Sequence, residues 1–170
     1  GVKVPGGVPL ALNSAVGVYM QNRSKNMHGI WVKGASFADN GLNEVTVLHE
    51  FVHAATARKI GLGSLLASTG QVREAVKDLN ALANQVVAEY NRRFASGELP
   101  ESLKTDRRLR HALGDPKELV AYGMTDPEVQ QWLKSVTLPG ERKTLWNNFV
   151  EAVRRLLGID PSSNDALSNL

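Results

Sequence analysis

The sequence predicts one α+β domain that is mostly α-helical. Two short stretches, 15–20 and 29–33, are rich in β-branched and aromatic residues, whereas apolar residues recur at three- and four-residue steps from residue 44 onward. The chain has 170 residues, 42% of them hydrophobic, which is enough for one substantial core. We therefore expect a small N-terminal β-hairpin or sheet packed on a helix, then a helical part.

Within this single domain, 1–170, we expect strands and one helix over about 14–60, further helices over about 70–157, and a tail at 158–170. The chain lacks an initiator Met, and its last five residues resemble a helix cut short. We therefore expect a piece of a longer protein. No stretch approaches the roughly 20 apolar residues that span a membrane, and the start lacks the apolar segment of a signal peptide.

Composition limits the chemistry that the chain can support. Cysteine is absent, so any metal site must be built from His and carboxylate groups. The net charge of +3 is mildly basic, with basic residues concentrated at 92–93, 107–110 and 154–155. Because no aromatic residues interleave with them as in a nucleic-acid groove, we interpret them as solvated helix faces and treat nucleic acid as the weaker alternative partner.

The N-terminal strands are separated by the polar stretch 21–26, which favours a hairpin or small sheet. The strand from Met27 to Lys33 either offers an edge along which an extended peptide pairs or is an ordinary hairpin strand. A turn-rich segment follows at 39–43, with Asn40 or Asn43 as the N-cap of the next helix.

Two helices are predicted next. The first runs from Glu44 to about Ile60 and stops at Gly61, with an apolar side formed by Val45, Leu48, Val52, Ala55 and Ala57. The second runs over 71–94 and packs into the core through Val72, Ala75, Val76, Leu79, Leu82, Ala83, Val86, Val87 and Tyr90.

The C-terminal half begins with an irregular or short-helical region at 95–114. Two helices then start with the same chemistry, an Asp N-cap followed by Pro, at 115–116 and 126–127; the first ends near Gly123. A final amphipathic helix over 141–157 buries Leu145, Trp146, Phe149, Val150, Val153 and Leu156.

The segment 49–53, His-Glu-Phe-Val-His, is the strongest indication of function. Residues four apart share a helix face, so His49 and His53 can reach one metal ion. Zinc suits the pair because it accepts neutral imidazole nitrogens and, in catalytic sites, keeps one position open for water beside three protein ligands. Glu50 would then stand where it can take a proton from that water.

A third ligand must come from elsewhere in the chain, and Glu118, His111 and Glu128 are the candidates. We favour Glu118, which begins an amphipathic turn and shares a face with Tyr122. The alternative is that Glu118, three residues after Asp115, completes a capping box. The two roles are largely exclusive, because a metal-bound carboxylate has little capacity left to reach the cap.

The chain resembles a known group of domains. An extended segment at 29–32, the motif segment 48–54, a long helix and the segment 115–129 follow one another as in the zincin-like metallopeptidase domains of large multidomain phage and mobile-element proteins. The resemblance covers roughly residues 28–157 and is of the gluzincin kind, in which a Glu on a downstream helix is the third ligand. It implies a zincin-like fold, a peptide or protein substrate, and a location in the cytoplasm of a host cell or in the virion.

By this resemblance, His49, His53 and Glu118 hold Zn²⁺, and Glu50 is the general base of a zinc endopeptidase. Zinc acidifies its bound water and polarises the scissile carbonyl, while the base moves the water proton to the leaving amine. The chain departs from many gluzincins at Tyr122, where they place an Asp or Glu that orients a histidine.

A hydrogen-bond donor to the oxyanion is also required, and Tyr122 and His111 are the catalytic candidates for it. The structural alternatives are a packed Tyr and a solvent-exposed His. A catalytically degenerate zincin that serves as a structural or binding module is the main competing function. The intact segment 49–53 argues against that alternative.

Overall fold

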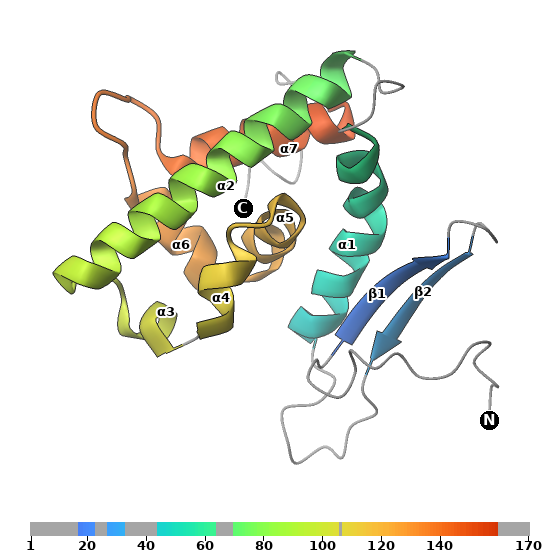
Figure 1. The fold of residues 1–170 in the computed structure, drawn as a ribbon, viewed down its shortest axis with the longest axis horizontal. Coiled ribbons are helices and arrows are strands. Elements are labelled where there is room, and N and C mark those ends of the chain that lie inside the picture. Colours follow the sequence, from blue (N-terminus) through green and yellow to red (C-terminus); the bar gives the residue numbers. More distant parts are fainter. Residues whose placement is uncertain (1–16, 23–26, 33–43, 64–69, 106, 160–170) are drawn as a thin grey trace.

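Seven helices and two strands make up the described part of the chain (Figure 1). The structure is a computed structural model and describes residues 17–22, 27–32, 44–63, 70–105 and 107–159. The elements are β1 (Gly17–Asn22), β2 (Met27–Val32), α1 (Glu44–Gly63), α2 (Gly70–Ser96), α3 (Glu101–Thr105), α4 (Arg107–Ala112), α5 (Pro116–Thr125), α6 (Pro127–Ser135) and α7 (Leu145–Leu157). The predicted turn at 39–43 and most of the tail lie outside these residues. Among the described helices, none is long and apolar enough to cross a membrane.

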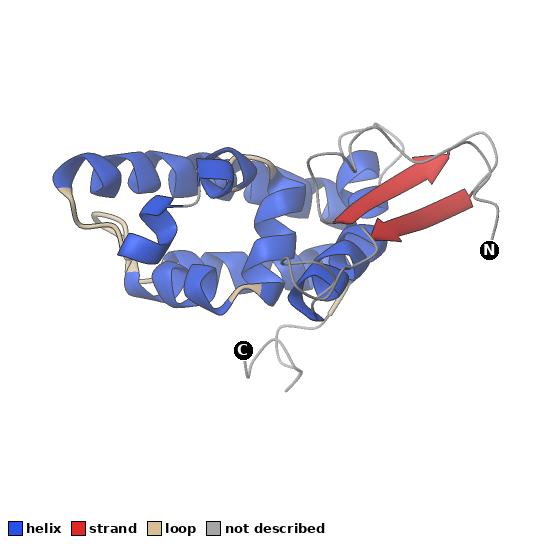
Figure 2. Cartoon of the chain, turned by 90° about the horizontal axis from the view of Figure 1, so that it is seen from below, coloured by secondary structure: helices blue, strands red, loops and turns tan. Residues whose placement is uncertain are grey.

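The predicted α+β class is wrong, because the fold is helical. In the described part of the chain, every core residue belongs to a helix or to a segment that joins helices. The paired segments β1 and β2 form only an antiparallel two-stranded ribbon beside α1 at one end of the molecule, and no sheet layer packs on the core (Figures 1 and 2). A run of β-branched residues predicts extended backbone locally, but two strands alone offer too little surface to build a core.

The helical core is centred on α2 and α7, which lie side by side (Figure 1). The apolar residues predicted for 71–94 form the buried face of α2, apart from Val72 and Val87, which are partly buried. Arg155 of α7 pairs with Asp78 of α2 across this contact. The residues predicted to be buried in α7 are also buried, apart from Val150, which is partly buried. A clear period of 3.6 residues therefore predicted the buried face of both helices.

The two Asp-Pro sequences begin helices as predicted. Asp115 Oδ1 accepts a hydrogen bond of 2.8 Å from the backbone N–H of Lys117. Asp126 Oδ1 accepts from the backbone N–H of Glu128 at 2.8 Å. The first of these helices, α5, does not end near Gly123 but continues to Thr125.

The last helix begins at Leu145, four residues later than predicted. Thr144 is its N-cap, and the side chains of Thr144 and Asn147 form a reciprocal capping box. Before the cap, Thr137 and Thr144 pair as an isolated antiparallel bridge around the turn at Gly140. A strong cap therefore overrides the apolar pattern that extends the predicted helix upstream.

Helix α1 packs against the other helices through a polar face. Glu50, at 6% exposure, is buried together with His53 and Thr56, and Ile60 is the one α1 residue in the buried core cluster of the described chain. The predicted apolar side is therefore wrong in part, since Leu48 is 54% exposed. Val45 and Phe51 are also exposed. The helix continues past the predicted stop to Gly63.

Candidate metal centre

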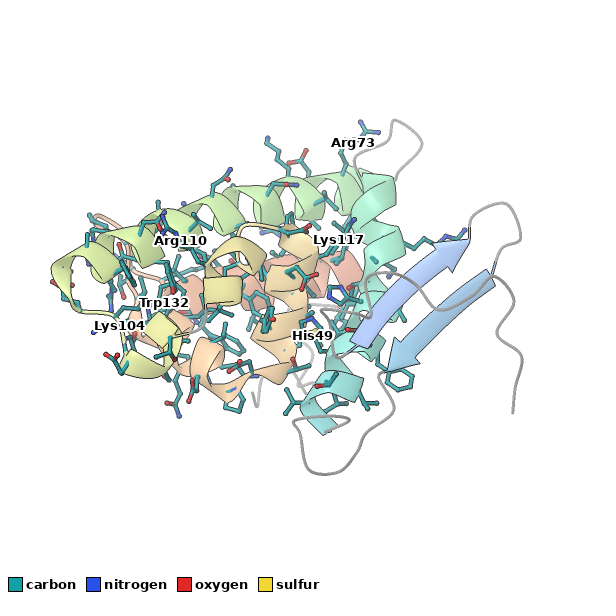
Figure 3. The ribbon with its side chains drawn as sticks, turned by 60° about the horizontal axis from the view of Figure 1, so that its bottom comes forward. His49, Arg73, Lys104, Arg110, Lys117 and Trp132 are labelled. Carbon is teal, nitrogen blue, oxygen red and sulfur yellow. The ribbon has the colours of Figure 1, made fainter. Side chains whose placement is uncertain are left out.

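The two motif histidines lie on the side of α1 that faces α5, since both contact Glu118. Figure 3 labels the first of them, His49. Their spacing of four residues places one imidazole a helical turn beyond the other. The Nε2 atoms of His49 and His53 are 3.0 Å apart, and the ring planes meet edge to face at 76°. The helix thus presents two nitrogen donors to one point in space.

Glu118, in the first turn of α5, completes the group. Its Oε2 lies 3.3 Å from His49 Nε2, and its Oε1 lies 3.3 Å from His53 Nε2. The potential ligand atoms of the three residues all lie within 4.8 Å of one another. Three ligands at about 2.0–2.1 Å around a tetrahedral zinc are separated by roughly 3.3 Å, so these distances suit such an ion.

The donor set also suits zinc chemically. Two imidazoles and one carboxylate are a ligand set of catalytic zinc sites, which leave a fourth position for water. The side chains of His49 and His53 are 15% and 11% exposed, whereas that of Glu118 is 36% exposed. Glu118 is therefore the member of the group that is most open to solvent.

The N-cap of α5 does not depend on Glu118. Asp115 caps the helix through its own side chain, and both carboxylate oxygens of Glu118 face the imidazoles. The capping box that α7 forms between Thr144 and Asn147 is a useful contrast, because there the third residue of the helix reaches back to the cap. The geometry therefore disfavours the capping alternative for Glu118.

The electrostatics of Glu118 reflect these contacts. Burial raises the pKa of the Glu118 carboxyl, but hydrogen bonds from the imidazoles of His49 and His53 outweigh burial and lower the pKa from 4.5 to about 2. The group is therefore a carboxylate at neutral pH. A negative charge held between two imidazoles is the arrangement expected of a ligand to a cation.

Glu50 follows His49 on α1, at a rotation of about 100° around the helix. Its side chain is buried, and it does not belong to the group of potential ligand atoms formed by His49, His53 and Glu118. The predicted general base is therefore the chain neighbour of His49 but is not one of the three potential metal ligands. Its role in proton transfer stays a prediction.

Tyr122 contacts the centre through its ring. The ring lies edge to face with that of His49, with centroids 4.6 Å apart and planes at 65°. Tyr122 is one turn after Glu118, so the same face of α5 supplies a carboxylate and an aromatic wall.

The other candidates are not brought to the centre in the described structure. Glu128 is exposed in the first turn of α6, outside the donor group. His111 belongs to α4, but its side chain lies outside the described part of the chain, so its oxyanion role stays a prediction. The strand predicted as a peptide-binding edge is β2, and β1 lies nearer to α1 (Figure 1).

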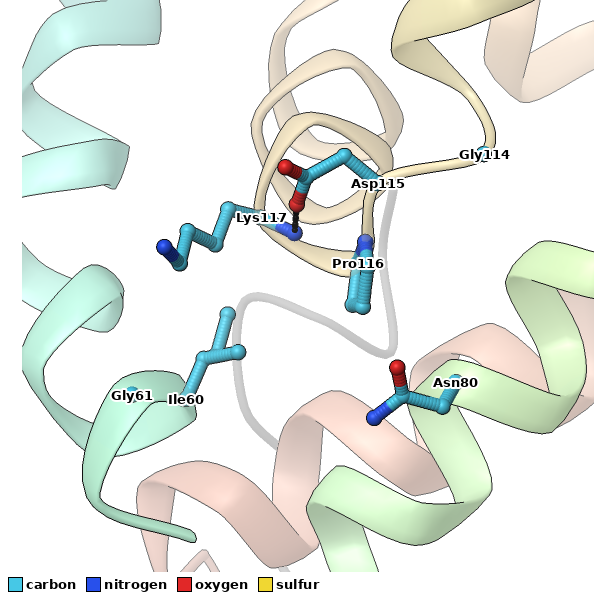
Figure 4. A pocket seen from close by; sticks show the side chains of 7 residues that line it. All are labelled: Ile60, Gly61, Asn80, Gly114, Asp115, Pro116 and Lys117. Carbon is cyan, nitrogen blue, oxygen red and sulfur yellow. Dashed lines mark hydrogen bonds between the residues drawn. The ribbon is translucent and has the colours of Figure 1, made fainter. Parts of the chain in front are cut away.

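A surface pocket of about 470 Å³ lies elsewhere, where the end of α1 meets the start of α5 (Figure 4). Its lining includes Ile60, Asn80, Asp115 and Lys117 but none of the metal-site residues. Ile60 follows His53 by seven residues, or about 10 Å along a helix. The pocket and the candidate metal centre therefore share no residue, although Lys117 directly precedes Glu118.

Two residues near the centre carry signals that the sequence prediction did not use. Thr56 is buried on the histidine face and donates a 2.7 Å hydrogen bond to the carbonyl of Val52. Gly123 is a buried residue in the interior of α5. A glycine inside a helical pattern often marks a position where a neighbouring element packs closely against the helix. Gly123 could therefore have been identified from the sequence as such a position.

Comparison with known proteins finds no matching family model, no similar curated protein and no similar solved structure.

The pKa of Glu118 provides a test of the metal-free site. We expect the carboxyl to titrate near pH 2 in the parent and nearer to its ordinary value of 4.5 in His49→Ala, because one hydrogen bond to the carboxylate is lost. Carbon-13 NMR of the Glu side chains measures both values. Because the pKa is lower in the folded state, the stabilisation from Glu118 is complete above about pH 4.5 and is lost as the pH falls towards 2. A parent Glu118 that titrates near 4.5 would contradict the contact with the imidazoles.

Proposed function

We propose that this chain is a zinc-dependent endopeptidase domain of the gluzincin kind. One observation carries the proposal: the nitrogen atoms of His49 and His53 and the carboxylate of Glu118 converge from two helices at the spacing of zinc ligands. The phage and mobile-element domains that the sequence resembles support the same function. The substrate class that follows is a peptide or protein.

In this proposal, His49, His53 and Glu118 hold the metal, and Glu50 performs the proton transfer. Bound zinc would supply a Lewis acid that polarises the scissile carbonyl and makes a water molecule more acidic. Glu50 accepts a proton as the water oxygen bonds to the carbonyl carbon, and then donates it to the nitrogen as the C–N bond breaks.

The two competing functions have less support. A degenerate zincin has no need of the complete set of His49, Glu50 and His53. A nucleic-acid-binding surface would require available basic groups, yet Arg92 and Arg93 both pair with Glu89. Zinc-independent, salt-sensitive binding of DNA would favour that alternative instead.

The ligand assignment is tested by two matched substitutions. Glu118 and Glu128 are both first-turn residues of helices that begin with Asp-Pro, but only Glu118 faces the histidines. We expect Glu118→Gln to weaken zinc binding more than about 100-fold, the upper range for loss of a residue that supports a ligand, and Glu128→Gln to leave it unchanged. Competition with a chromophoric chelator measures both affinities. Equal affinities in the two variants, or a parent chain that does not bind zinc, would refute the metal site.

The assignment of the general base is tested by Glu50→Gln. The amide retains the size of the side chain but cannot accept the proton, so cleavage should fall by about 10²–10⁴-fold while zinc affinity stays the same. Mass spectrometry of a mixed peptide library incubated with each zinc-loaded protein measures the rates. If the variant cleaves as fast as the parent, Glu50 is not the base. If the zinc-loaded parent cleaves nothing, the degenerate zincin is the better interpretation.

Tyr122 is tested by separating its hydroxyl from its ring. We expect Tyr122→Phe to lower kcat by about 100-fold with unchanged zinc affinity, because the hydroxyl is lost from oxyanion stabilisation while the ring contact with His49 remains. Tyr122→Leu removes the ring as well, so zinc affinity should also fall. Steady-state kinetics and chelator competition provide the two readouts. Full activity in Tyr122→Phe would limit Tyr122 to packing against His49.

A further inference from the structure

Helix α5 contacts α7 at a position where there is no room for a side chain. A Cβ atom on Gly123 would lie 2.5 Å from Cζ, 2.7 Å from Cε2 and 3.0 Å from Cε1 of Phe149. Gly123 is not among the described glycines with positive φ, so its backbone conformation is open to other residues. The close approach of the Phe149 ring is therefore what requires glycine here.

The Phe149 ring has little freedom to move away. It is fully buried on α7 and stacks on Trp146, with ring centroids 5.3 Å apart and planes at 27°. Protein interiors are close-packed, so a ring fixed by neighbours on several sides transmits a displacement rather than absorbing it. An added methyl group on Gly123 would consequently move α5.

Such a movement acts on the candidate metal centre. Five residues separate Glu118 from Gly123, which is a rotation of about 140°, so the two residues lie towards opposite sides of α5. Glu118 and Tyr122 face α1. Helix α5 is thus held between the Phe149 ring on one side and the histidines of α1 on the other.

We propose that Gly123 and Phe149 are positioning residues that set how closely α5 approaches α1 and thereby place Glu118 among the zinc ligands. This inference rests on the proposed function. Relieving a 2.5 Å contact to an ordinary carbon–carbon distance requires a shift of about 1 Å. Metal ligands tolerate deviations of only about 0.2 Å. Both residues would act through the position of Glu118, without contacting the substrate.

The test is zinc affinity in a two-residue cycle. We expect Gly123→Ala to weaken zinc binding by about 10–100-fold, as for the loss of other residues that orient ligands. Phe149→Leu leaves space beside α5 and should also weaken binding, whereas Gly123→Ala combined with Phe149→Leu fills that space and should restore affinity to within a few-fold of the parent. Gly70→Ala is the matched control, because a Cβ there meets nothing within 4 Å, and it should bind zinc as the parent does.

Affinity measured on folded protein distinguishes positioning from a general loss of stability. If Gly123→Ala acted only by destabilising the core, the folded fraction of the variant, followed by circular dichroism, would bind zinc as tightly as the parent. The proposal is overturned if Gly123→Ala binds zinc like the parent, or if the double variant binds no better than Phe149→Leu. The latter comparison remains decisive even if Gly123→Ala does not fold.

A second readout does not depend on metal. The rings of His49 and Tyr122 have centroids 4.6 Å apart, so nuclear Overhauser contacts between them report the approach of α5 to α1. In metal-free protein these contacts should weaken in Phe149→Leu and return in the double variant. Unchanged contacts in Phe149→Leu would refute the positioning role. A parent that retains the ring contacts but binds no zinc would refute the proposed function instead.

Discussion

Helix α1 meets α5 through a polar contact in which Glu118 faces His49 and His53. Ile60 is its one residue in the buried apolar cluster of the described chain, while Glu50, His53 and Thr56 are buried. Each buried polar group that lacks a partner costs about 1–3 kcal/mol. The carboxylate of Glu118 meets part of this requirement by facing both imidazoles. The contact that places α1 against α5 is therefore also the contact that forms the candidate site.

This constraint links metal binding to stability. Without a cation, the imidazoles and the carboxylate satisfy one another, at Nε2–oxygen distances of 3.3 Å. A cation bound only in the folded state would add its binding free energy to folding and join α1 directly to α5. The residues of the site would therefore hold α1 to α5 in addition to binding the cation. Loss of Glu118 would affect both properties through one contact.

Local sequence signals predicted much of the helical architecture. The apolar period of α2 and the Asp-Pro starts of α5 and α6 each depend on neighbouring residues, so they are legible without tertiary information. The predicted fold class was wrong because it depends on tertiary contacts. Local sequence predicts that the N-terminal backbone is extended, but whether the strands form part of the core depends on which distant segments pack against them.

Helix α1 shows where a periodic pattern fails. Val45, Leu48 and Phe51 lie on an exposed side of the helix, whereas His53 and Thr56 are buried. Hydrophobic periodicity assumes that the apolar face turns inwards, and that assumption does not hold for a helix whose polar side chains are paired by a partner helix. The motif indicates the other face, because two histidines four residues apart can bind one metal ion.

Tertiary structure supports the choice of Glu118 over Glu128 as the candidate third ligand. Helices α5 and α6 each have an Asp cap, a Pro and an early Glu, so their cap chemistry alone does not separate the two residues. Their surroundings do separate them: α5 lies against α1, and Glu128 is exposed on α6. The approach that brings Glu118 to the histidines is in turn permitted by the missing side chain at Gly123, against the Phe149 ring. The composition of this candidate site thus depends on how the helices pack as well as on which residues the sequence provides.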